Sequence, residues 1–172
     1  MGLAQRLEIM PDCKASSGCP DQHRPVLLES VLAGLVVHPQ GVYVDATYGR
    51  GGHARAILER LGEQGRLIVA DRDPEAIAHA QSQLGNEPRC EVLHSNLAGL
   101  PQLLGDRGDA GLIDGLLVDL GVSSPQLDDA QRGFSFRHDG PLDMRMDPSQ
   151  GESAAEMLEG LSTPELARII RS

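Results

Sequence analysis

The stretch YVDATYGRGGH, residues 43–53, decides the fold. Its first residues alternate like a strand that ends at Asp45, three glycines follow, and a pattern of helical period comes after them. A strand, a glycine turn and a helix N-terminus together make a site where free backbone N–H groups and the positive end of the helix dipole face a ligand. The stretch therefore predicts an α/β unit that holds a ligand at the turn.

The alternation of strand and helix continues on both sides of this stretch. Further apolar runs predict strands at 66–71, at 90–94 and in the segment 112–121, where the strand is expected to end at Asp119. Helical patterns occur from Pro25, at 54–62, from Asp73 as N-cap with Pro74 to about Leu84, and at 99–104. This order predicts an open parallel sheet with helices on both faces, a Rossmann-like α/β fold.

The residues around the glycines favour an adenosine-type ligand. The register Gly49-x-Gly51-x-x-Ala54 fits the loose dinucleotide fingerprint, and Asp71 ends the second strand, where a carboxylate accepts both hydroxyls of a ribose. Asp45 faces the turn, where it attracts the cationic amino group of a methionine moiety and repels a pyrophosphate. S-adenosylmethionine is therefore favoured over NAD. The alternative is that the glycines only make a tight turn and Asp71 only caps a strand end.

Composition limits the class of protein. The chain has 172 residues, three cysteines and no apolar run long enough to read as a membrane span, so we expect one soluble, cytoplasmic domain with reduced thiols. A net charge of −10 argues against a broad basic surface for nucleic acid, although it is compatible with a local basic groove. Four aromatic residues cannot build a sheet-wide platform for base stacking.

Changes in composition divide the chain into three parts. Residues 1–22 have no periodicity and are expected to form a flexible leader, followed by a ligand-binding core at 23–120. The segment 121–150 is rich in Gly, Pro, Ser and Asp, and such long loops are usually functional. Capping boxes at 153–156 and 162–165 then predict two helices, and the second lacks a C-terminal signal, so we expect the chain to stop in mid-element.

Five motifs together resemble a known family: HRPVLLES, DATYGRGGH, DRDPEA, DLGVSSPQLD and GFSFRHDGPLDMRMD, between residues 23 and 147. They are similar to the bacterial methyltransferases of the MraW or RsmH type, which modify the exocyclic N4 of a cytidine in the decoding region of small-subunit ribosomal RNA. The resemblance covers residues 23–172. It implies a class I methyltransferase with a seven-stranded sheet and a mostly helical insertion after the fourth strand. This chain would then be the N-terminal portion, truncated after the fourth strand and the start of the insertion. The part of the insertion present, residues 121–172, would belong to the substrate-recognition domain.

The resemblance also implies site residues and partners. S-adenosyl-L-methionine would be the cofactor, and small-subunit ribosomal RNA within the small ribosomal subunit would be the substrate. Asp71 would take the ribose, and Leu97 falls where relatives often have a phenylalanine beside the adenine. The cofactor contacts expected in total, with Asp45 added from the argument above, are Asp45, Gly51, Gly52, His53, Asp71, Leu97, Asp119 and Gln126.

Asp119 is the candidate catalytic residue. The cytosine amino nitrogen is a poor nucleophile, so an acceptor that binds its protons and stabilises the developing charge would help methyl transfer. Asp119 ends the fourth strand near the expected ligand. The usual signature of amino methyltransferases, an Asn, Asp or Ser followed by two prolines and an aromatic residue, is absent from DLGVSS.

Other residues of these motifs allow two interpretations each. Phe134 and Phe136 either pack against a flipped base or anchor a loop to the core. His23 either orders the cofactor entrance or lies on the surface. The three arginines Arg132, Arg137 and Arg145 either meet RNA phosphates or pair with the nearby carboxylates of Asp128, Asp139, Asp143 and Asp147.

Two other functions remain as alternatives. An NAD-dependent oxidoreductase is favoured only by the loose glycine register. A non-catalytic nucleotide-binding fragment is favoured by the expected truncation, because a sheet that stops after four strands exposes an unpaired edge.

Overall fold

The computed structural model describes residues 25–171, in which four parallel strands form one sheet of order β3-β2-β1-β4. The predicted leader and His23 lie outside the described residues. The strands are β1 (Val42–Asp45), β2 (Arg66–Asp71), β3 (Cys90–His94) and β4 (Gly115–Leu117). The predicted Rossmann-like α/β fold with a parallel sheet is confirmed.

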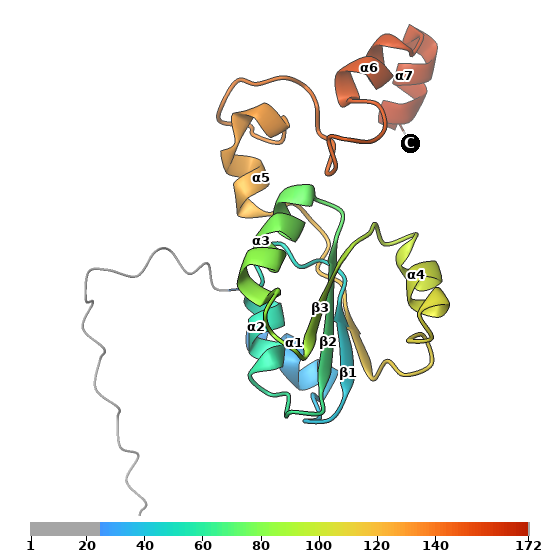
Figure 1. Ribbon diagram of the computed structural model, residues 1–172. Coiled ribbons are helices and arrows are strands. Elements are labelled where there is room, and N and C mark those ends of the chain that lie inside the picture. Colours follow the sequence, from blue (N-terminus) through green and yellow to red (C-terminus); the bar gives the residue numbers. More distant parts are fainter. Residues whose placement is uncertain (1–24, 172) are drawn as a thin grey trace, which may run out of the picture.

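Helices cover both faces of the sheet, as predicted (Figure 1). The first face packs against α1 (Leu28–Leu35), α2 (Gly52–Leu58) and α3 (Pro74–Leu84), and the second against α4 (Leu100–Asp106). Successive side chains of a strand point to opposite faces, so Leu67 and Val69 lie in one apolar cluster and Ile68 in the other. Burial on both faces explains why β2 reads as a continuous apolar run.

Two elements end earlier than the sequence predicts. Helix α2 begins at Gly52 and ends at Leu58, and the chain then forms a turn in which the N–H of Arg60 bonds to the carbonyl of Ile57 at 2.9 Å. The N–H of Gly62 lies outside the helix and bonds to the carbonyl of Pro39 at 2.7 Å. Strand β4 ends at Leu117, whose carbonyl accepts the N–H of Ala46 beyond the end of β1. Asp119 therefore lies after the strand and not within it.

Residues 121–171, called here the distal region, lie at the carboxyl end of the sheet, and residues 25–120 are called the core region. The distal region contains α5 (Ser124–Asp128), the 3₁₀ helix η1 (Ala130–Arg132), α6 (Ala154–Glu159) and α7 (Thr163–Arg171). The segment 121–150 is thus not a loop throughout, since it forms α5 and η1. The two predicted helices after it are confirmed, and Figure 1 shows them at the far end of the molecule from β1. A domain boundary near residue 120 stays a prediction.

A membrane span would need a long apolar helix. None of the helices within residues 25–171 has both the length and the apolar character for that role.

Candidate functional site

Three carboxylates gather at the carboxyl end of the sheet. Asp45 ends β1, Asp71 ends β2, and Asp119 follows β4 by two residues. Strand β1 lies between β2 and β4. The strands that follow β1 in the chain, β2 and β3, lie on one side of it and β4 lies on the other, so the strand order reverses at this place. Open α/β sheets bind their ligands at such a switch point. The structure therefore brings together three of the residues that the sequence singled out.

Asp45 is a buried carboxylate with one oxygen left over. Its side chain is buried, Oδ1 accepts the N–H of Thr47 at 3.1 Å, and Oδ2 has no partner among the described residues. Burial raises the pKa of Asp45 to about 7, and the charges of Asp71 and Asp119 add to this effect while the Thr47 bond opposes it. Buried polar atoms without a partner are rare and call for an explanation. A cationic ligand group at this oxygen would supply one.

Asp71 connects the glycine turn to the start of α3. Its Oδ2 accepts the N–H of Gly49 at 2.8 Å, and its Oδ1 accepts the N–H of Asp73 at 2.9 Å. Each carboxylate oxygen has two lone pairs, so one on each oxygen remains for another donor. The side chain thus shapes the turn and keeps the capacity for two hydroxyl groups, and its role as ribose ligand stays a prediction.

The backbone conformation and the packing of the protein itself require glycine at positions of this turn. Gly49 and Gly51 have φ angles of 55° and 74°, which side chains disfavour. A Cβ atom at Gly51 would lie 2.6 Å from the ring of Tyr48, and one at Gly52 would collide with Pro25. The tight-turn interpretation therefore has direct support, and contact of these glycines with a cofactor stays a prediction.

His53 and Asp119 lie beside each other at the end of β4. His53 is buried, with Nε2 3.2 Å from the carbonyl of Val26 and Nδ1 3.9 Å from Oδ2 of Asp119. The N–H of Asp119 donates to Oγ1 of Thr47 at 2.8 Å, while its side chain is 55% exposed. The backbone of Asp119 is thus fixed and its carboxylate faces solvent. Sequence reasoning missed Thr47, whose only signal was a hydroxyl two residues after Asp45.

Gln126 and Leu97 lie in different surroundings from the three carboxylates. Gln126 is buried in α5, where Nε2 donates to Oδ2 of Asp73 at 2.6 Å and Oε1 accepts the N–H of Ser123 at 2.9 Å. Leu97 follows β3 and is exposed. Their expected cofactor contacts stay predictions. The bond from Gln126 to Asp73, two residues beyond Asp71, was not foreseen.

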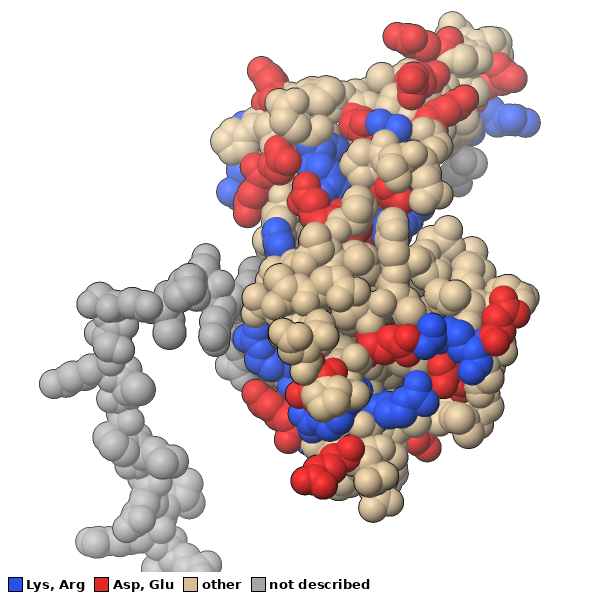
Figure 2. All heavy atoms as spheres, viewed as in Figure 1, with Lys and Arg blue, Asp and Glu red and all other residues tan. Residues whose placement is uncertain are grey.

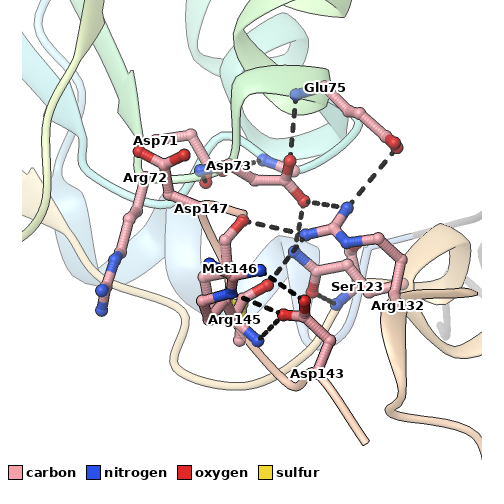
Figure 3. Close-up of polar contacts among 12 residues, drawn as sticks. Asp71, Arg72, Asp73, Glu75, Ser123, Arg132, Asp143, Arg145, Met146 and Asp147 are labelled. Carbon is pink, nitrogen blue, oxygen red and sulfur yellow. Dashed lines mark hydrogen bonds and ion pairs between the residues drawn. The ribbon is translucent and has the colours of Figure 1, made fainter. Parts of the chain in front are cut away.

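The arginines differ from one another. Arg132 is buried and pairs with Asp73 at 2.9 Å, so the predicted pairing with a nearby carboxylate of its own segment is wrong (Figure 3). Arg145 does pair with Asp143, at 2.6 Å, as that interpretation expected. A chain segment with several carboxylates does not show which of them an arginine will choose.

The two phenylalanines also differ. Phe136 is fully exposed, so the interpretation that it anchors a loop to the core is wrong. Phe134 is half-buried. Contact of either ring with a flipped base stays a prediction.

Charged side chains of both signs are mixed on the surface. The face drawn in Figure 2 shows acidic groups among the basic ones and no broad basic area. Within residues 25–171, no group of His, Cys, Asp and Glu side chains is arranged to hold a metal ion. The charges of Asp71 and Asp119 instead act on the buried carboxylate of Asp45 at the switch point.

Comparison with known proteins adds two findings. A family model described as the MraW methylase family matches residues 21–172. The protein named Ribosomal RNA small subunit methyltransferase H of Halorhodospira halophila is 65% identical over 149 residues. The match covers 87% of this chain and 46% of that relative, so the chain spans about half the length of the curated relative.

Proposed function

Since the chain belongs to the MraW methylase family, a group of methyltransferases, we propose that it binds S-adenosylmethionine at the carboxyl ends of β1, β2 and β4. The observation that carries this proposal is the buried Oδ2 of Asp45, which has no partner within residues 25–171. A carboxylate in this position complements the ammonium and sulfonium charges of that cofactor. The pyrophosphate of NAD would lie at the glycine turn, where the charge of Asp45 repels it, so an oxidoreductase is not favoured.

The residues present fit such a ligand. Asp71 would bind the ribose hydroxyls and Asp45 the amino group. Further contacts would come from Gly51, Gly52, His53, Leu97, Asp119 and Gln126. The bound cofactor supplies a methyl group on an already activated leaving group, so positioning of the acceptor is the main task left to the protein.

The proposed reaction is methylation of the N4 amino group of a cytidine in the decoding region of small-subunit ribosomal RNA, in the cytoplasm. The name of the relative, a ribosomal RNA small subunit methyltransferase, supports this substrate class. Asp119 is the proposed acceptor for the amino protons, because its carboxylate is exposed while its backbone is tied to Thr47. A carboxylate there orients the nitrogen and stabilises the charge that develops on it.

Calorimetric titration with S-adenosylhomocysteine and, separately, with NAD tests the choice of ligand. We expect S-adenosylhomocysteine to bind and NAD to give no heat of binding. Binding of NAD alone would overturn the proposal. When affinity is compared between the wild type and Asp45→Asn, Asp106→Asn is the control for a general effect of charge, because it is an exposed change at the end of α4.

A second candidate function is cofactor binding without turnover. It is favoured by the openness of the site to solvent. The side chain of Asp119 is 55% exposed, and Leu116 of the edge strand β4 and Val118 of the loop after β4 are exposed too. Methyl transfer usually takes place where water is excluded. An assay of methyl incorporation into small ribosomal subunits separates the two functions. Incorporation that is lost in Asp119→Asn supports the reaction, and binding with no incorporation supports the second candidate.

A further inference from the structure

The distal region is attached to the core through a buried arginine. Arg132 is 6% exposed and lies at the end of η1. Its Nη1 atom is 2.9 Å from Oδ2 of Asp73 and 3.6 Å from Oε2 of Glu75. Its Nη2 atom donates to the carbonyls of Met146 at 2.8 Å and Arg145 at 3.3 Å. One side chain thus joins α3, η1 and the segment before α6 (Figure 3).

Asp73, the carboxylate that pairs with this arginine, is hydrogen-bonded to the candidate site. The N–H of Asp73 is bonded to Oδ1 of Asp71, whose other oxygen holds the N–H of Gly49. Asp73 also caps α3 through the N–H of Glu75 at 2.9 Å. A continuous series of bonds therefore runs from Arg132 through Asp73 and Asp71 to the glycine turn. Any shift of the turn on ligand binding has a direct route to the distal region.

The chemistry of the pair favours a positioning role. Asp73 is 3% exposed and Oδ2 accepts bonds from both Arg132 and Gln126, while Nε of Arg132 has no partner among the described residues. Desolvation of two buried charges offsets much of their attraction, so such a pair adds little net stability compared with apolar packing. It does impose one geometry, because the planar guanidinium must meet a carboxylate and two carbonyls together.

We propose that Arg132 is a positioning residue that couples occupancy of the methyl-donor site to the docking of the distal region. The inference rests on the proposed function, because the ligand at Asp71 is the methyl donor. By linkage, a ligand that binds more tightly when the region is docked must itself favour docking to the same degree. Substrate contacts in residues 121–150 would then be in place only when the donor is bound.

Hydrogen exchange of the full chain, with and without S-adenosylhomocysteine, tests the coupling. On ligand addition the wild-type protein should show slower exchange at the glycine turn, residues 49–52. It should also show slower exchange in two segments of the distal region, 123–132 and 143–147. In Arg132→Met the turn should still be protected by ligand, while the distal segments should gain no protection. The dissociation constant for S-adenosylhomocysteine should rise about 5- to 20-fold, the lower part of the range of a typical coupling.

Two further variants make the result specific. Arg132→Lys keeps the charge but cannot reach the carboxylate and both carbonyls, so it should restore only part of the ligand-dependent protection. It also carries the test if Arg132→Met fails to fold, which loss of protection in β1 and β2 would reveal. Arg168→Met, an exposed change in α7, removes the same charge and should leave affinity within about twofold.

The outcomes distinguish this inference from the proposed function. Protection of the glycine turn without protection of 123–132 in the wild type would overturn the coupling alone. Full ligand-dependent protection of 123–132 in Arg132→Met would do the same. Absence of any protection at the turn in the wild type would overturn the proposed function, and the coupling with it.

Discussion

The core and distal regions are held together by different forces. All the buried apolar side chains among residues 25–171 belong to the core region, including Ile57, Leu67 and Ile68, which are completely buried. The buried residues of the distal region are Gln126, Arg132 and Asp147, all of them polar. Apolar burial is the dominant favourable term in folding, so the core region should carry most of the stability. The distal region depends on hydrogen bonds and ion pairs that position it.

This difference bears on how the site works. Asp45, Asp71 and His53 stand on elements that pack into the apolar core. The distal region meets this platform mainly through Asp73, and through His94, whose Nε2 is 3.6 Å from Oδ2 of Asp147. Elements with few buried apolar contacts open locally at low cost in free energy. The part of the site proposed to hold the cofactor should therefore be rigid, and the distal region, proposed to meet the substrate, should be adjustable.

The largest effect should come from removing apolar volume in the core region. Ile57 is 0% exposed, so Ile57→Ala should lower the free energy of unfolding by about 2–5 kcal/mol. The matched change Met157→Ala in α6, where the side chain is 50% exposed, should cost less than about 0.5 kcal/mol. Urea unfolding followed by circular dichroism measures both. Equal losses would show that the distal region has an apolar core of its own.

The next largest effect should be on ligand affinity at the junction of the two regions. Asp71→Ala removes the acceptor of Gly49 and Asp73 and the proposed ribose ligand, so affinity for S-adenosylhomocysteine should fall about 100-fold or more. Asp71→Asn keeps one acceptor oxygen and should lose about 10-fold. Isothermal titration calorimetry measures both constants. Unchanged affinity in Asp71→Ala would remove the ribose assignment.

The fold of the core region could be predicted because its signals are local or periodic. The strand predicted at 66–71 matches β2, and Asp73 with Pro74 starts α3 as expected, with the carboxylate on the N–H of Glu75. Capping depends on residues two or three positions apart, which the sequence displays directly. The Ser153 capping box in the distal region was predictable for the same reason.

The polar contacts between the regions could not be predicted in this way. Arg132 and Asp73 are 59 positions apart, and the four carboxylates that the sequence offered as partners, Asp128, Asp139, Asp143 and Asp147, all lie closer to Arg132 in the sequence. Charge alone does not select a partner, because any carboxylate satisfies an arginine equally well until the fold sets the distances. The glycine turn shows the same limit: its sequence suggested a ligand, while the structure shows that Tyr48 and Pro25 already exclude side chains there.

A smaller effect should follow the ionisation of Asp45. The pKa of this group is about 7 in the folded protein, against an ordinary value of 3.8, because burial disfavours the charge. The folded state therefore keeps a proton that the unfolded state loses between about pH 4 and 7, and stability falls as pH rises through that window. Asp45→Asn removes this loss, so at pH 8 it should raise the free energy of unfolding by about 1–3 kcal/mol.

Urea unfolding of Asp45→Asn and wild type at pH 5, 6, 7 and 8 measures the difference between them. The gap should widen up to about pH 7 and then stay constant, and effects of other titrating groups cancel in the comparison. A gap independent of pH would mean that Asp45 is ionised throughout. The same variant should bind S-adenosylhomocysteine more weakly, because the charge proposed to face its amino group is gone.

The smallest effect should stay within the distal region. Ser153→Ala removes the oxygen that accepts the N–H of Glu156 at 3.2 Å, and loss of such a cap costs a helix about 0.5–2 kcal/mol. Since α6 has no buried residue, this loss should speed hydrogen exchange at the start of α6 severalfold and leave β1 and β2 unchanged. Ser162→Ala is the matched change at the start of α7. Faster exchange in β1 or β2 would show that the two regions open together, and the polar junction at Asp73 would then bind them as firmly as an apolar core does.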